Sequence, residues 1–192
     1  MAIPGHYFDH HYQPTTMATT NLSTVHDYQP EGNVKNYRIG IVTAQWNPEV
    51  TGALLRGAVH TLDRYGVPQA NILTHSVPGS FELTLGAQWL AQQHNIDAVI
   101  CLGCIIQGET RHFDFISQAV ATGITEVALK TNKPIIFGVL TPNDQQQALD
   151  HAGGVHGNKG DEAAITALQM LDLNDALLKS NGLHAPIGFM GR

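Results

Sequence analysis

From residue 37 onward, short apolar runs alternate with longer segments in which apolar residues recur every three to four positions. The short runs are rich in β-branched residues, which is typical of strands, and the longer segments have the period of helices. We expect strands at residues 38–43, 71–77, 98–106 and 134–140, and helices at residues 50–65, 81–93, 112–130, 144–152 and 161–179. Strands and helices in alternation predict a parallel sheet that is covered on both faces.

The fold class that follows is α/β, a flavodoxin-like three-layer α/β/α sandwich with a four-stranded parallel sheet. One domain is expected over residues 37–180, because 192 residues are enough for a single full core. Residues 1–36 are polar and without periodicity, which predicts a flexible N-terminal arm, and residues 181–192 form an irregular tail. Four histidines in the arm are interpreted as part of a solvated segment, with adventitious metal binding as the alternative.

The two cysteines, Cys101 and Cys104, form a CxxC motif inside a predicted strand. Positions i and i+3 of a strand point to opposite faces, so the two thiols cannot easily share a disulfide or a metal. We therefore expect two buried core cysteines and no metal site.

Charge and hydropathy exclude two classes of partner. The formal net charge of −6 and the isoelectric point near 5.9 disfavour a nucleic-acid binder, which needs clustered Lys and Arg. The longest apolar run has nine residues, against the roughly 18 needed to span a bilayer. The N-terminus lacks the basic and apolar layout of a secretory signal, which predicts a cytoplasmic protein.

The loops after the predicted strands should meet at one edge of the sheet, where α/β proteins bind ligands. Trp46 follows the first strand and could stack on a planar ring or cap the core. Ser80, Phe81 and Glu82 follow a Pro-Gly turn and could meet a polar ring, or simply begin a helix.

The third loop contains GET at residues 108–110, before a predicted helix. Backbone N–H groups at such a position bind anions. His112, expected one turn into that helix, could transfer protons near neutral pH, or it could be structural. Lys159 lies in a glycine-rich stretch, residues 151–164, which a connection between helices would also explain.

Taken together and in order, the motifs resemble the 6,7-dimethyl-8-ribityllumazine synthase family. They are IGIV at 39–42, WN at 46–47, VPGSFE at 77–82, DAVICLGCIIQGETRHFDFI at 97–116, IIFGVLT at 135–141 and GNKGDEAA at 157–164. The resemblance implies condensation of 5-amino-6-(D-ribitylamino)uracil with 3,4-dihydroxy-2-butanone 4-phosphate, with release of phosphate and water. It implies no metal and no organic cofactor.

The resemblance also implies roles for single residues. Residues expected to bind the pyrimidine ring and the ribityl chain are Trp46, Asn47, Ser80, Phe81, Glu82, Ile105 and Ile106. Phe137 matches a residue that reaches the pocket of a neighbouring subunit, and His112 matches the proposed proton shuttle.

For the phosphate, the matching residues are Glu109, Thr110 and Lys159. The family usually has Arg where this chain has His151, and a histidine cannot make a bidentate, permanently charged contact. Arg111 is the nearest cation in sequence that could compensate.

The family resemblance further implies a homo-oligomer, a pentamer or an icosahedral shell of sixty subunits, with sites shared between adjacent subunits. Riboflavin synthase is a candidate partner, and nucleic acid and membrane are not expected. The alternative function is a non-catalytic riboflavin-binding or carrier protein on the same scaffold, because Trp46 would also stack on a flavin.

Overall fold

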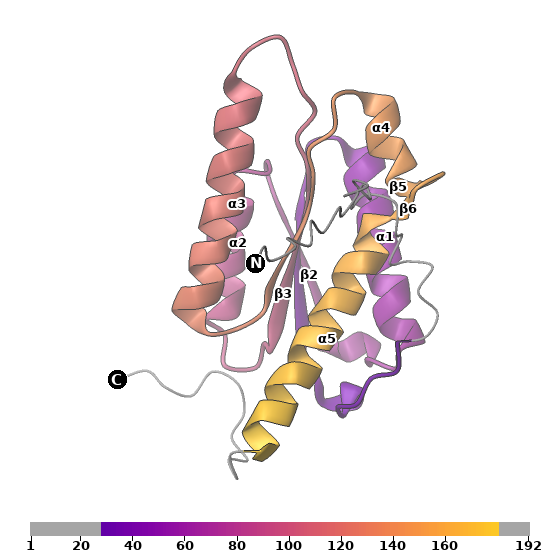
Figure 1. Cartoon of the computed structure of the whole chain (residues 1–192), viewed down its shortest axis with the longest axis vertical. Helices are drawn as coiled ribbons and strands as arrows, with labels where there is room; N and C mark the ends of the chain where they lie inside the picture. The colour runs from indigo at the N-terminus through magenta and orange to yellow at the C-terminus, as the bar shows by residue number, and fades with distance from the viewer. Residues whose placement is uncertain (1–27, 181–192) are drawn as a thin grey trace, which may run out of the picture.

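The computed structural model describes residues 28–180 of the chain. Its centre is a four-stranded parallel sheet with the strand order β2-β1-β3-β4 (Figure 1). The strands are β1 (Ile39–Ala44), β2 (Ile72–Val77), β3 (Ala98–Cys104) and β4 (Ile135–Leu140). β1 and β3 are inner strands in which every residue is buried, whereas β2 and β4 form the two edges. The predicted four-stranded parallel sheet is confirmed.

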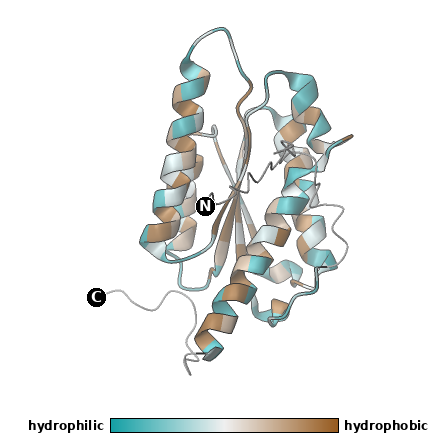
Figure 2. Ribbon diagram, in the orientation of Figure 1, coloured by the Kyte–Doolittle hydropathy of each residue, from teal (hydrophilic) through white to brown (hydrophobic). Residues whose placement is uncertain are grey.

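Helices cover both faces of this sheet. α1 (Pro48–Arg64) and α5 (Lys159–Ser180) pack on one face, and α2 (Leu83–Ala91) and α3 (His112–Thr131) pack on the other. The short α4 (Gln145–Asp150) follows β4. In Figure 2 the strands are mostly hydrophobic, whereas the helices carry both hydrophilic and hydrophobic residues. The three-layer sandwich is therefore confirmed, and within residues 28–180 no helix is both long and apolar enough to cross a membrane.

Some element ends differ from the prediction. α2 begins at Leu83 instead of residue 81, because the Leu83 N–H bonds the Ser80 carbonyl to close a turn before the helix. β3 ends at Cys104 instead of residue 106. A hairpin of β5 (Ala152–Gly154) and β6 (Gly157–Asn158) was not predicted, since strands of three and two residues are too short to show alternation.

The two cysteines belong to different cores. Cys101 lies in the apolar cluster beneath α2 and α3, and Cys104 lies in the cluster beneath α1 and α5. Burial raises the pKa of the Cys101 thiol to about 12 and that of the Cys104 thiol to about 11. The prediction of two buried cysteines on opposite faces of the strand is confirmed.

The described chain begins at Tyr28, so residues 1–27 of the expected arm and the tail at 181–192 lie outside the described residues. From Tyr28 onward the segment lies against α5, where it surrounds the carboxylate of Asp172. That carboxylate accepts hydrogen bonds from Tyr28 Oη at 2.7 Å, Glu31 N at 2.9 Å, Gly32 N at 3.0 Å and Tyr37 Oη at 3.1 Å. Burial and the nearby carboxylates raise the pKa of both phenols, so they act as neutral donors.

Replacement of Asp172 should release this segment. Hydrogen bonds to a charged group contribute more than neutral ones, and we expect Asp172→Ala to lower the free energy of unfolding by about 2 kcal/mol. Chemical denaturation at one fixed protein concentration measures this change. The matched control is Asp175→Ala, which removes one acceptor of Tyr37 Oη and should cost less. Equal losses in the two variants would contradict the central role of Asp172.

Candidate active site

The loop after β1 is tied to the end of β3 by Asn47. This residue has a left-handed backbone conformation with φ of 56°, which asparagine tolerates better than most residues. Its side-chain amide donates a hydrogen bond of 3.1 Å to the Cys104 carbonyl. Pro48 then occupies the start of α1, where a missing N–H has no cost. Trp46, the residue before Asn47, is thereby placed at the carboxyl edge of the sheet.

The turn after β2 lies beside Trp46. A Cβ atom built on Gly79 would be 3.9 Å from the Trp46 ring, and the Gly79 N–H donates a hydrogen bond of 3.0 Å to Glu82 Oε2. The side chains of Trp46 and Phe81 are 69% and 57% exposed. The indole ring therefore does not cap the core, and both aromatic rings are accessible to a ligand.

Ser80 is the buried member of the same turn. Its hydroxyl lies next to Gly103 of β3, where an added Cβ atom would be 2.7 Å from Ser80 Oγ. Only 6% of Ser80 is exposed, and Oγ has no hydrogen-bond partner among residues 28–180. The glycine in β3 therefore allows the β2–α2 turn to pack directly on the end of β3, across β1 from β2.

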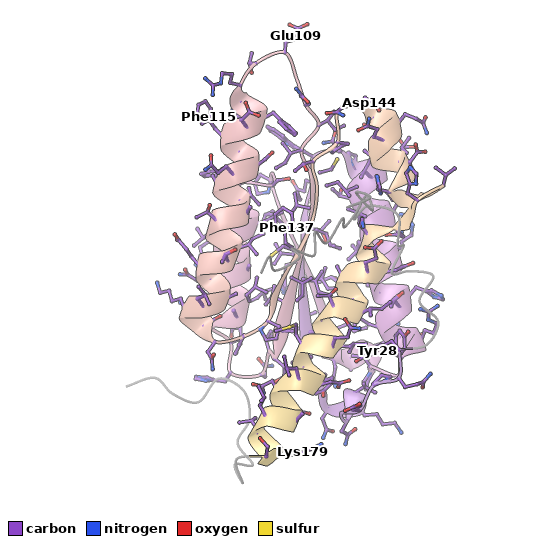
Figure 3. All side chains as sticks on the ribbon, in the orientation of Figure 1. Tyr28, Glu109, Phe115, Phe137, Asp144 and Lys179 are labelled. Atoms are coloured by element: carbon purple, nitrogen blue, oxygen red, sulfur yellow. The ribbon has the colours of Figure 1, made fainter. Side chains whose placement is uncertain are left out.

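The loop after β3 extends beyond the rest of this edge, with Glu109 at its far end (Figure 3). Ile105 and Ile106 at its base are partly buried, each packed against a different core cluster. Glu109 and Thr110 are exposed and precede the helix, because α3 begins at His112. The predicted start of the helix at residue 112 is confirmed, so His112 is its first residue and does not lie one turn inside it. Its backbone N–H lies 3.4 Å from Thr110 Oγ1.

A groove of about 1020 Å³ runs along the open edge of the sheet, between α3 and α5. β4 forms its floor, with Phe137 in the middle of that strand and 43% exposed (Figure 3). His151 and Lys159 line the same groove. We refer to this space as the β4 groove.

The structure divides the predicted site residues into two sets. The edge set lies in the loops at the carboxyl edge and comprises Trp46, Asn47, Ser80, Phe81, Glu82, Ile105, Ile106, Glu109, Thr110, Arg111 and His112. The groove set comprises Phe137, His151 and Lys159. No member of the edge set is among the residues that line the β4 groove.

Arg111, the suggested substitute for an arginine at position 151, contacts residues of its own helix. Its Nε lies 3.9 Å from an Asp114 carboxylate oxygen, and its guanidinium carbon lies 5.6 Å from the centre of the Phe115 ring. Within one chain, Arg111 and His151 therefore belong to different sets.

Two charged or titratable side chains that the sequence did not single out lie beside the groove set. Glu162, only 8% exposed, accepts a hydrogen bond of 2.7 Å from Lys159 Nζ. The i,i+3 spacing of this pair at the start of α5 was a usable signal. The ring of His156 stacks on that of His151 with 4.8 Å between centres, a contact that depends on the unpredicted hairpin.

Burial lowers the pKa of His151 below its usual value, and the positive charges of His156 and Lys159 lower it further. Glu162 and Asp150 act in the opposite direction but do not offset this effect. The surroundings of His151 therefore favour its neutral form in the free chain.

Residues 28–180 contain no cluster of three or more His, Cys, Asp or Glu side chains that could hold a metal ion. What the carboxyl edge offers is exposed aromatic surface, a carboxylate, hydroxyls and a histidine. These groups, on a parallel α/β sheet, define an α/β protein that is suited to binding a polar, ring-containing small molecule.

Comparisons with known proteins identify the family. Residues 36–175 match the family model of 6,7-dimethyl-8-ribityllumazine synthase. A protein of that name from Cytophaga hutchinsonii is 62% identical over 154 residues, which cover 80% of this chain and 96% of that protein. One from Porphyromonas gingivalis is 50% identical over 159 residues, 82% of this chain and 98% of that protein. The chain belongs to the 6,7-dimethyl-8-ribityllumazine synthase family.

Proposed function

We propose that this protein is a transferase of riboflavin biosynthesis that joins 5-amino-6-(D-ribitylamino)uracil to 3,4-dihydroxy-2-butanone 4-phosphate. The products are 6,7-dimethyl-8-ribityllumazine, phosphate and water. The observation that carries this proposal is the family match over residues 36–175, which includes both the edge set and the groove set.

In this proposal the edge set binds the pyrimidine. Trp46 and Phe81 offer the ring surfaces on which a planar heterocycle stacks. Asn47, Ser80 and Glu82 supply polar atoms for the ring edge and the ribityl hydroxyls, and Ile105 and Ile106 form the apolar base. Glu109 and Thr110 stand at the phosphate end of the same loop.

The chemistry requires proton transfers and no electron transfer. The arylamine condenses with the ketone to an imine with loss of one water, phosphate leaves by elimination, and the ring closes with loss of a second water. His112 is exposed at the start of α3 and is the proposed group that moves protons between these steps.

The separation of the two sets supports a site shared between chains. Phe137, His151 and Lys159 lie on the β4 groove, so they would meet the edge set of a second copy placed against that groove. We infer a homo-oligomer, a pentamer or a sixty-subunit shell, in which each site takes one set from each of two neighbours. The single domain over residues 37–180, the cytoplasmic location and an association with riboflavin synthase, which would consume the lumazine product, belong to the same proposal.

An assay with both substrates tests the function. We expect lumazine formation, followed by its absorbance, with one phosphate released for each product molecule. The alternative, a flavin carrier, predicts riboflavin binding without any phosphate release. Omission of either substrate is the control, since phosphate released without the pyrimidine would indicate a different reaction.

Removal of the proposed proton shuttle should slow the reaction without stopping it. We expect His112→Ala to reduce kcat by about 10² or less, because aligned substrates react in part without acid–base catalysis. His94→Ala, which removes an exposed histidine before β3, is the matched control and should keep the wild-type rate. Complete loss of activity in folded His112→Ala would show that His112 does more than transfer protons.

A shared site makes complementation between defective chains testable. One chain carries Trp46→Ala and His112→Ala in the edge set, and the other carries Phe137→Ala and Lys159→Gln in the groove set. Coexpressed in equal amounts and mixed randomly, they should restore about a quarter of the sites, because each intact site needs one unaltered set from each neighbour.

The control for this experiment is a mixture of two chains that both carry lesions in the edge set, in which no intact site can form. A site contained within one chain would give no recovery in either mixture, and that result would contradict the shared site.

A further inference from the structure

The His151–His156 stack is formed by the β5–β6 hairpin. The His156 N–H donates to the Asp150 carbonyl at 2.9 Å, and the Lys159 N–H donates to the His151 carbonyl at 2.9 Å. Gly154 makes this fold-back feasible, because a Cβ atom there would lie 2.7 Å from Asp150 Cα. The two imidazole rings are 4.8 Å apart with an interplanar angle of 30°. His151 lines the β4 groove, and the exposed ring of His156 stacks on the ring of His151 from the solvent side.

Both lysines that line the β4 groove are already engaged. Lys133 Nζ donates to the carbonyls of Ala91 and Gln93 at 2.7 and 2.9 Å, and Lys159 Nζ pairs with Glu162 at 2.7 Å. The groove therefore has little unpaired positive charge while His151 is neutral. Among the groove residues of one chain, an anion that enters the groove gains an unpaired cation only if His151 takes up a proton.

We propose that His151 and His156 form a proton-linked phosphate site at the end of the β4 groove, in which His156 controls the protonation of His151. This inference rests on the proposed function, which supplies the phosphate ester. His156 is a positioning residue here, since it acts through the ring of His151.

The direction of the proton linkage follows from the surroundings of His151. Its Nδ1 is buried and has no partner within residues 28–180, and His156 and Lys159 oppose a positive charge, while Glu162 and Asp150 favour one. Burial and its cationic neighbours lower the pKa of His151 in the free protein. At a pH above that pKa, binding of a dianion is therefore coupled to the uptake of a proton by His151. Phosphate binding should therefore weaken as the pH rises, and loss of the proton would help the released phosphate to leave.

Sulfate is a suitable probe, because it remains a dianion between about pH 6 and pH 8, where imidazole titrates. At constant ionic strength, its inhibition constant against the butanone phosphate should rise with pH by at most tenfold per unit, the limit for one linked proton. His151→Arg should bind sulfate tightly with no pH dependence, and should lower KM for the butanone phosphate most above pH 7. His151→Asn should bind weakly at every pH.

Two substitutions of His156 separate charge from packing, since both new side chains are planar and can stack. His156→Phe removes the neighbouring charge and should move the midpoint of the sulfate profile to higher pH. His156→Arg makes that charge permanent and should move the midpoint to lower pH. His60→Phe, an exposed histidine on α1, is the control and should leave the midpoint unchanged.

A sulfate inhibition constant that does not change with pH in the wild type would overturn the proposal, even with normal turnover. The proposal would also fail if the midpoint stayed unchanged in both His156→Phe and His156→Arg, or if it moved in the same direction in both variants. Absence of turnover in the wild type would instead contradict the proposed function. In that case, the midpoints can be obtained from sulfate binding measured by calorimetry across the same pH range. That measurement tests the role of His151 and His156 without any need for turnover.

Discussion

Burial of β1 and β3 on both faces is the constraint on which the rest of the structure depends. Strands without an exposed residue need a helical layer on each side, and α1 with α5 and α2 with α3 provide these layers. The candidate site is attached to the same two strands. Asn47 bonds the Cys104 carbonyl, and Ser80 packs against Gly103. The exposed rings of Trp46 and Phe81 are thus supported by the most buried part of the molecule.

Features encoded by local periodicity could be predicted from the sequence. The apolar run that begins at Ala98 was correctly predicted as a strand, and it lacks polar alternation because the strand is buried on both faces. The period of two also placed Cys101 and Cys104 in different cores. The helix stripes predicted which segments cover the sheet and also the first residue of α3. The first residue of α2 depends on a turn whose hydrogen bond is not visible in a hydrophobic pattern.

Features that depend on strand order and on short turns could not be predicted in this way. The position of β4 at the edge of the sheet is not visible in the sequence, so the sequence did not show that His151 and Lys159 lie apart from Thr110 within one chain. The stack of His156 on His151 requires the glycine-rich hairpin, whose strands are too short for any periodicity. Arg111 was a reasonable substitute by proximity in sequence, but its contacts with Asp114 and Phe115 follow from the position at which α3 begins.

The open edge of β4 gives the proposed assembly a physical reason. Phe137 on β4 and Met170, Leu173 and Leu177 on α5 are exposed apolar residues along one groove, whereas Trp46 and Phe81 are exposed at the carboxyl edge of the sheet. These are two different surfaces, so a contact in which one covers the other is heterologous. Only a closed ring of such contacts leaves neither apolar surface exposed on any subunit. In such a ring every subunit contributes both of its sets, and each His151 is placed against the edge set of a neighbouring chain.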